Sequence, residues 1–138
     1  MKRLSLFGLT LVVAFSFSCK KLIQQQEEKA VMTIITNGNW YVTQYLQGAS
    51  DLTTNFSGYL FKFNANGVVT GTLNSASDTG TWVPNVDART ITSNFPTAGS
   101  PVNLLNAVWK INDSGTDFVL ASYTDSTSTL HTLRLKKQ

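Results

Sequence analysis

The feature that most constrains the fold of this chain is a two-residue alternation of apolar and polar side chains along short segments. Tyr59, Phe61 and Phe63 occupy every second position of one segment, and a second segment places His131, Leu133 and Leu135 in the same way. Successive side chains of a β-strand point to opposite faces, so this period predicts strands buried on one face only. The rest of the domain is rich in Ser, Thr, Asn, Val and aromatic residues, a composition typical of strands and turns. We therefore expect an all-β domain.

About eight such segments follow one another, and short polar loops join most of them. The expected strands cover residues 40–46, 59–63, 68–73, 81–83, 90–95, 105–112, 118–123 and 129–136. In the first of these, the apolar residues of one parity are Trp40, Val42 and Leu46. The order predicts an antiparallel up-and-down barrel or a sandwich. The closed barrel is favoured, because eight strands enclose just enough room for side chains or one small ligand.

A short helix is expected immediately before the strands. Val31, Ile34 and Ile35 recur at i, i+3 and i+4, which predicts one or two helical turns with an apolar face. A first strand at this place is the alternative interpretation.

The charge of the chain argues against a nucleic-acid partner. The formal net charge is +3, but five of the basic residues lie before residue 38. From Gly38 onward, six basic and six acidic residues balance, so the domain itself is neutral. Nucleic-acid binding requires a basic surface, and no such partner is expected.

The first eighteen residues have the pattern of an export signal. Lys2 and Arg3 precede an apolar run, Leu4–Phe17, that ends just before Cys19, the only cysteine of the chain. A helix of that length would cover roughly 21 Å, which is less than the ~30 Å hydrocarbon core of a bilayer. A cleaved signal peptide over residues 1–18 is therefore expected in place of a spanning helix.

The residues before Cys19 resemble the lipobox of bacterial lipoproteins. In that pattern the cysteine receives a diacylglyceryl group on sulfur and becomes the first residue of the mature protein; an aliphatic residue is usual where Ser16 stands here. Lipidation also gives a lone cysteine a role, since a disulfide needs a pair. Ordinary signal-peptidase cleavage, which leaves a free thiol, is the alternative.

This resemblance implies a protein held at the membrane of a Gram-negative cell envelope by lipidated Cys19, with residues 19–32 as a tether. Lys20 and Lys21 follow the cysteine, and the aspartate associated with inner-membrane retention is absent. The outer membrane is therefore the expected location.

The remaining domain, residues 33–138, resembles the lipocalins, including the compact lipocalin-like domains of Gram-negative lipoproteins. The resemblance depends on the ordered motifs G-x-W, F-x-F-x-x-x-G and G-x-W, which stand here as Gly38–Trp40, Phe61–Gly67 and Gly80–Trp82. It implies an eight-stranded barrel in which Trp40 crosses one end and Arg134, a basic residue of the last strand, packs over it. It also implies a small apolar or amphipathic ligand.

Residue types that carry catalysis or hold metals are sparse. His131 is the only histidine, and Cys19 is assigned to the anchor, so partners for a metal site are missing. A Ser-His-Asp set would draw on Asp125 and one of the many serines, but the sequence shows no nucleophile elbow or similar frame. Asp113 and Asp117 lack the further ligands of an EF-hand loop and are interpreted as turn residues. No enzymatic activity, cofactor or metal is expected.

Six side chains on the strands are candidates for lining a ligand pocket, although packing in a filled core is the alternative. They are Tyr59, Phe61, Phe63, Trp109, Tyr123 and His131. A cavity of a few hundred Å³ lined by these residues would favour a small apolar or amphipathic ligand. A filled interior would favour a module that binds or inhibits another envelope protein through the loops at 74–79 and 124–128.

Overall fold

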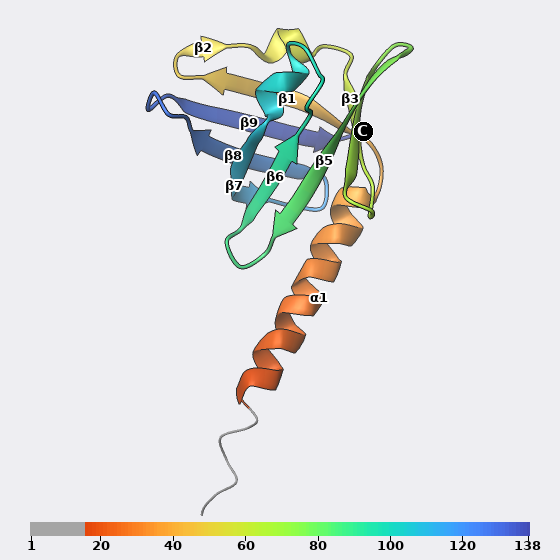
Figure 1. The fold of residues 1–138 in the computed structure, drawn as a ribbon, viewed down its shortest axis with the longest axis vertical. Coiled ribbons are helices and arrows are strands. Elements are labelled where there is room, and N and C mark those ends of the chain that lie inside the picture. The colour runs from red at the N-terminus through yellow and green to blue at the C-terminus, as the bar shows by residue number, and fades with distance from the viewer. Residues whose placement is uncertain (1–15) are drawn as a thin grey trace, which may run out of the picture.

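The computed structural model describes residues 16–138 as one helix that projects from one end of an antiparallel β-barrel (Figure 1). Nearly all of the expected signal peptide, residues 1–15, lies outside the described residues. Within residues 16–138, no helix combines the length and apolar character that crossing a bilayer requires.

Nine strands form a single antiparallel sheet in which β1 and β9 also pair. The strands are β1 (Trp40–Gln47), β2 (Ser50–Asp51), β3 (Leu60–Phe63), β4 (Val68–Leu73), β5 (Ala76–Asn85), β6 (Thr90–Asn94), β7 (Ala107–Ser114), β8 (Phe118–Thr124) and β9 (Leu130–Lys137). β2 has two residues and pairs only with the end of β1. The pairing of β1 with β9, from Trp40↔Lys137 to Gln47↔His131, closes the other eight strands into a barrel. The expected eight-stranded up-and-down barrel is confirmed.

Both ends of the barrel are covered. The helix α1 (Ser16–Thr36) reaches one end, and two 3₁₀ turns, η1 (Thr53–Phe56) and η2 (Val102–Leu105), lie at the other (Figure 1). Phe56, Val102 and Leu105 of these turns are buried. The interior is therefore reached only past one of these segments.

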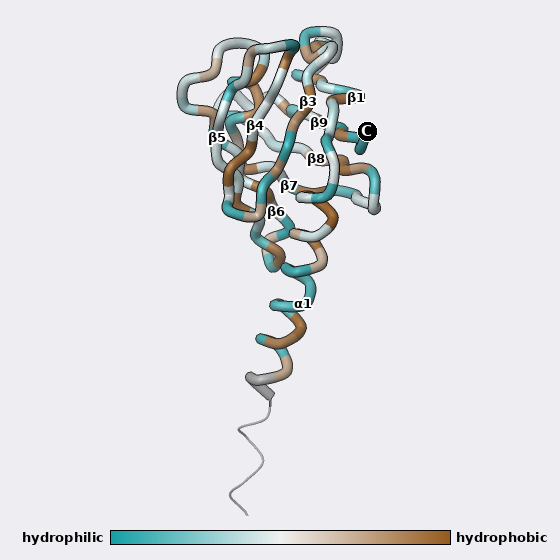
Figure 2. Tube along the Cα trace, turned by 90° about the vertical axis from the view of Figure 1, so that its right-hand side faces the viewer, coloured by the Kyte–Doolittle hydropathy of each residue, from teal (hydrophilic) through white to brown (hydrophobic). Residues whose placement is uncertain are grey.

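The inward-facing residues of the strands form one continuous core. In Figure 2 the apolar positions recur along the strands, as the alternation predicts. The largest fully buried side chains are Trp40, Trp82, Tyr45, Phe56, Phe61, Phe95, Val69 and Val102. The core is thus dominated by aromatic rings that fill the barrel.

Two strands differ from the simple alternation. A β-bulge between Val42 and Gln44 reverses the parity of β1, so that Tyr45 is buried and Leu46 is not. β5 also extends through residues 76–80, which we expected in a loop, and through Pro84. Pro84 is tolerated because the ladder with β4 ends at Thr81, so no hydrogen bond of that ladder is lost.

α1 is longer than the one or two turns expected around residues 31–35. The tether at 20–30 consists mostly of Lys, Gln, Glu, Leu and Ala, which have high helix propensity, and it contains no Gly or Pro. Ile35 is buried against the barrel, whereas residues 19–30 are exposed. This segment is thus a mostly exposed helical spacer whose buried contact with the barrel lies near the C-terminal end of α1.

Three side chains of the barrel hold the end of α1 by donating to its last carbonyls. The bonds run from Lys137 Nζ to Ile34 O (3.1 Å), from Trp40 Nε1 to Ile35 O (2.8 Å) and from Lys62 Nζ to Thr36 O (2.7 Å). The last carbonyls of a helix lack intrahelical partners and form the negative end of its dipole, so cationic donors stabilise them. This docking fixes α1 at the mouth of the barrel.

The implied packing of Arg134 over Trp40 is wrong. The Arg134 guanidinium carbon lies 5.7 Å from the ring centroid of Phe118, whereas Lys137 Nζ lies 5.1 Å from the Trp40 ring. The buried residues of β9 are odd-numbered. Position 134 therefore faces outward, and position 137 has the parity that brings a cation to the Trp40 ring, at the end of the barrel where α1 docks.

Candidate functional site

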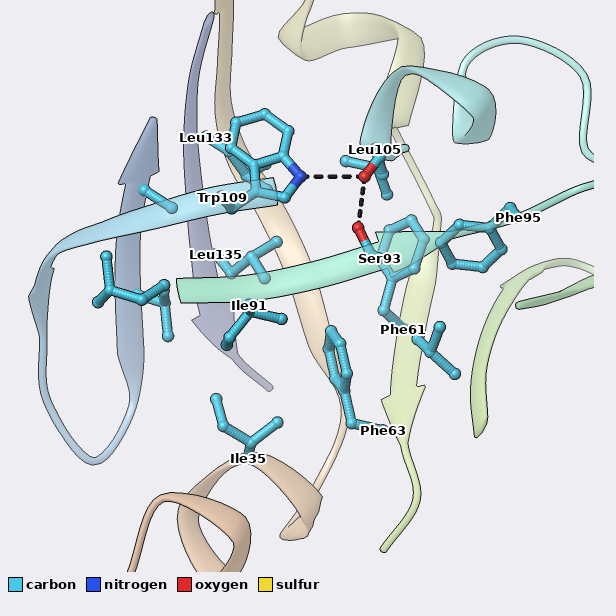
Figure 3. A pocket seen from close by; sticks show the side chains of 14 residues that line it. Ile35, Phe61, Phe63, Ile91, Ser93, Phe95, Leu105, Trp109, Leu133 and Leu135 are labelled. Atoms are coloured by element: carbon cyan, nitrogen blue, oxygen red, sulfur yellow. Dashed lines mark hydrogen bonds between the residues drawn. The ribbon is translucent and has the colours of Figure 1, made fainter. Parts of the chain in front are cut away.

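The barrel encloses a small apolar cavity (Figure 3). Its volume is about 50 Å³, and Ser93 is the only polar residue among the fourteen that line it. Phe61, Phe63 and Trp109, three of the six candidate pocket residues, form part of its wall. Pockets for drug-sized ligands measure roughly 300–1,000 Å³. The interior is therefore mostly a filled core.

The polar atoms in the cavity wall already have partners. Ser93 Oγ and Trp109 Nε1 both donate to the carbonyl of Leu105, the latter over 2.9 Å (Figure 3). A group that entered the cavity would meet apolar surface, so the cavity can accept only an apolar part of a ligand.

A larger groove of about 670 Å³ lies at the mouth of the barrel, between α1 and the turn that joins β5 to β6. Its walls include Pro84 and Asn85 at the end of β5, Val86 and Asp87 of that turn, and Val31 of α1. Four apolar residues line both the groove and the cavity: Ile35, Ile91, Ile111 and Val119. The two spaces therefore share an apolar floor, and the groove alone has the volume of a ligand pocket.

The rim of the groove is polar. Glu27 of α1 and Asp87 and Arg89 of the β5–β6 turn line it. Gln24 Nε2 donates to Asp87 Oδ1 over 2.9 Å, which links the helix to the turn. Arg89 has φ +53°, uncommon for a residue with a side chain, and within residues 16–138 it makes no ion pair. An apolar floor with an ionic rim suits an amphipathic molecule.

A chain of hydrogen bonds at the other end of the barrel includes the single histidine. His131 Nε2 lies 3.0 Å from Asp125 Oδ2, and His131 Nδ1 lies 3.1 Å from the Tyr45 hydroxyl. That hydroxyl donates to the carbonyl of Leu104 in η2 over 3.0 Å. Tyr123 stacks on the imidazole at a centroid distance of 4.4 Å. The chain thus connects β9, the β8–β9 turn, β1 and η2.

The electrostatics of this chain are those of a buried structural network. Hydrogen bonds from Thr127 and then from His131 hold the pKa of Asp125 well below its usual range. Burial raises the pKa of Tyr45 and that of Tyr123. Asp125 is therefore ionised and both tyrosines are neutral at physiological pH. Tyr45 is 0% exposed, so no substrate can reach its hydroxyl.

The structure places only three of the six candidate pocket residues in the cavity wall. Phe61, Phe63 and Trp109 line the cavity, as described above. Tyr59 instead stacks on Phe61 at 6.0 Å, and Tyr123 and His131 belong to the hydrogen-bonded chain. The six residues therefore do not form one pocket.

The other residues considered from the sequence lie at the surface. Cys19 is exposed on α1, outside the part of the helix that contacts the barrel. Asp113 was expected in a turn but lies in β7, paired with Leu120 next to a β-bulge, and its Oδ1 accepts from the backbone N–H of Ser114 over 2.9 Å. Among the described residues, no three His, Cys, Asp or Glu side chains are grouped to hold a metal ion.

Sequence reasoning missed the groove and most of the histidine network. The inward orientation of Tyr45 was not predicted, because it depends on the β1 bulge, which no local sequence pattern indicates. Asp125 accepts from Thr127 and Thr129 in the following turn, a pattern that the spacing D-x-T indicates. The groove depends on where α1 docks, which the sequence does not show.

Comparison with known proteins supports the fold. No protein-family model and no curated protein matches the sequence. A crystal structure of a DUF4847 family protein from Bacteroides vulgatus is similar at a TM-score of 0.54 and 19% identity, covering 78% of this chain and 99% of that one. Japanin from Rhipicephalus appendiculatus bound to cholesterol is similar at a TM-score of 0.54 and 11% identity, covering 76% and 78%. At these identities the similarity concerns the fold alone, and it shows that the chain forms a closed lipocalin-like barrel.

Proposed function

We propose that this protein is a lipid-anchored lipoprotein of the Gram-negative outer membrane that binds a small apolar or amphipathic ligand at the mouth of its barrel. The single observation that carries the proposal is the groove of about 670 Å³ whose apolar floor continues into the barrel cavity. A lipocalin-like neighbour bound to cholesterol supports the choice of an apolar ligand. The ligand would lie in the groove, since the interior holds only about 50 Å³.

The direction of α1 supports a ligand taken from the membrane. From Cys19 to Ile35 the helix spans about 24 Å at 1.5 Å per residue, and it projects from the end of the barrel that carries the groove (Figure 1). If Cys19 carries acyl chains, the mouth of the barrel faces the bilayer. A membrane lipid could then reach the groove with a short path through water.

Two matched variants test the ligand site. Val86 lines the groove, whereas Val83 is exposed on the outer face of β5. We expect Val86→Trp to fill the groove and to abolish the binding of fatty acids or sterols in native mass spectrometry, while Val83→Trp retains it. Wild-type protein that binds no member of a lipid panel would overturn the proposed function. Equal binding by the two variants would place the ligand elsewhere.

The anchor is tested by the mass of the protein extracted from membranes. Because Cys19 is the only cysteine, acylation of any cysteine must be at this residue. We expect a mature chain that begins at acylated Cys19, and release of Cys19→Ala protein into the soluble fraction. An unmodified mature chain of wild-type protein would contradict the anchor without affecting the ligand site.

The filled interior favours a second function, in which the barrel binds another envelope protein through its loops. Of the loops expected at 74–79 and 124–128, the first is largely part of β5 (residues 76–79), whereas residues 125–128 of the second form a turn between β8 and β9 that Asp125 orders. A stoichiometric partner recovered from solubilised membranes, and lost when Thr127 is replaced by Arg, would support this function.

A further inference from the structure

We propose that Asp125, His131 and Tyr45 form a proton-dependent clasp that holds η2 over the inner end of the cavity, and that the clasp loosens when His131 loses its second ring proton. Only the predicted effect of the clasp on ligand release rests on the proposed function. The clasp itself can be tested without a ligand.

The count of hydrogens in the chain gives the first step. The Tyr45 hydroxyl has one hydrogen, and it lies 3.0 Å from the Leu104 carbonyl and 3.1 Å from His131 Nδ1. The carbonyl can only accept, so it takes the hydroxyl hydrogen, and Nδ1 must supply its own. The Asp125 carboxylate, 3.0 Å from Nε2, also only accepts. All three contacts are hydrogen bonds only when His131 is an imidazolium.

A neutral His131 leaves this chain one hydrogen short. If the remaining ring proton of His131 is on Nε2 and faces Asp125, the single hydrogen of the Tyr45 hydroxyl can bond to Nδ1 or to the Leu104 carbonyl, but not to both. If the hydroxyl keeps its bond to the Leu104 carbonyl, Nδ1 has no donor although His131 is only 3% exposed. If the hydroxyl bonds to Nδ1, the bond to η2 is lost. A buried acceptor without a hydrogen bond is costly, so loss of the proton weakens the attachment of η2.

His131 is the member of the chain on which the count of hydrogens depends. The titratable groups that face its ring are Tyr45 from β1, Tyr123 from β8 and Asp125 from the β8–β9 turn, and η2 contributes only a carbonyl. The pKa of Asp125 is lowered and the pKa values of the two tyrosines are raised. Histidine is the side chain that ordinarily titrates between pH 5 and 8.

The bond to Leu104 matters for the cavity, because the residue that follows Leu104 in η2 forms part of the cavity wall. Leu105 lines the cavity, and its carbonyl accepts from Ser93 and Trp109. η2 is also held by the buried side chains of Val102 and Leu105, so the bond from Tyr45 to the Leu104 carbonyl is one of several attachments of this four-residue turn. Loss of that bond should therefore loosen η2 at the inner end of the cavity at higher pH.

Nuclear magnetic resonance tests the proton count directly. Because the chain has one histidine, its two ring nitrogen signals are assigned without ambiguity. We expect both nitrogens to show the imidazolium shift at pH 5, and Nδ1 to lose it before the protein unfolds as the pH is raised to 8.5. A neutral ring at pH 5 would overturn the proposal.

Hydrogen exchange tests the effect on η2. We expect the protection factors of the Leu104 and Asn106 amides, corrected for intrinsic rates, to fall about tenfold from pH 5 to pH 8. Tyr45→Phe should give low protection at both pH values, whereas Tyr41→Phe on the same strand should behave as wild type. Wild-type protection that does not change with pH would refute the clasp, even if Tyr45→Phe fails to fold.

The consequence for the ligand is tested with 8-anilinonaphthalene-1-sulfonate as a fluorescent amphiphile. We expect its dissociation rate to increase severalfold from pH 5 to pH 8 in wild type, and to be independent of pH in Tyr45→Phe. If the protection of η2 depends on pH but neither the dye nor any lipid binds, the proposed function is refuted and the proposal of the clasp still stands. A pH-independent rate, together with binding that Val86→Trp abolishes, would refute only the regulation.

Discussion

At the residue scale, each glycine of the three sequence motifs has its own physical reason. Gly38 follows the end of α1 and has φ +84°, and Gly67 lies in the β3–β4 turn and has φ +82°. Both values lie in the left-handed region that favours glycine. Gly80 is needed for space, because a Cβ at this position would lie 2.4 Å from the carbonyl oxygen of Asn94 and 2.8 Å from the Phe95 ring. The motifs therefore mark places where the backbone turns or strands approach closely.

Replacing Gly80 should destabilise the barrel. We expect Gly80→Ala to lower the free energy of unfolding by about 2–3 kcal/mol, because the backbone of β6 must move to admit a methyl group. Gly99→Ala is the matched control, since nothing lies within 4 Å of its added Cβ. Urea denaturation measures both variants, and equal stability of the two would contradict the close approach.

The Asp125 carboxylate should make the free energy of unfolding depend on pH in the acidic range. Its pKa is lowered in the folded state, so the stabilisation is fully present above the unfolded value of about 4 and is lost as the pH falls through the folded value. We expect Asp125→Asn to be less stable than wild type at pH 7, and the difference to shrink below pH 3. Asp117→Asn serves as the control. A difference that persists at low pH would mean that the charge of Asp125 does not contribute.

At the element scale, the docking of α1 depends on how its last turn is satisfied. Most of the helix is exposed, and its last turns contact the barrel through Ile35 and its apolar neighbours and through the donors Trp40, Lys62 and Lys137. Further toward the N-terminus, Gln24 bonds to Asp87 of the β5–β6 turn. Helical propensity predicts that residues 20–30 can be helical, but it does not predict where the helix is attached. The groove exists because this attachment places α1 beside the β5–β6 turn.

Removing one cationic donor should loosen α1. We expect Lys137→Met to cost about 1–2 kcal/mol, because it removes a hydrogen bond to Ile34 and a charge at the helix C-terminus while retaining an aliphatic chain over Trp40. Lys136→Met, on the outer face of β9, should change stability by less than about 0.5 kcal/mol. Thermal unfolding and the helical circular dichroism signal compare the two variants.

At the scale of the whole molecule, closure of the barrel and the size of its core determine where a ligand can bind. Eight short strands leave an interior that aromatic side chains nearly fill, so the residual cavity is about 50 Å³. The space that fits a ligand therefore lies where the barrel meets α1, and depends on two elements that are far apart in the sequence.

Filling the residual cavity should stabilise the molecule without affecting the groove. Ala121 lines the cavity and does not line the groove. We expect Ala121→Val to raise the free energy of unfolding by about 1 kcal/mol, since each buried methylene contributes about 0.8 kcal/mol. Lipid binding should remain unchanged. A loss of stability would show that the cavity is already filled in solution, and a loss of binding would place the ligand inside the barrel.

Much of the fold was predictable because burial on one face of a strand leaves a local record. The alternations at 59–63 and 131–135 correctly predicted inward faces, and the spacing of turns predicted an up-and-down order. The same rule failed at β1, where the bulge reverses the parity of the strand, so that Tyr45 faces the interior in place of Leu46. It also failed at residues 76–80, because serine and threonine suit strands and loops alike.

The sequence by itself determined the all-β class, the meander of strands, the neutral domain and the position of the lone cysteine, since these follow from composition and local period. Only the tertiary structure decided that Lys137 and not Arg134 lies over Trp40, that three of the six candidate residues line the cavity, and that the groove lies between α1 and the β5–β6 turn. The physical reason is that register, bulges and helix docking depend on contacts between residues far apart in the chain. Such contacts leave no periodic signal in the sequence.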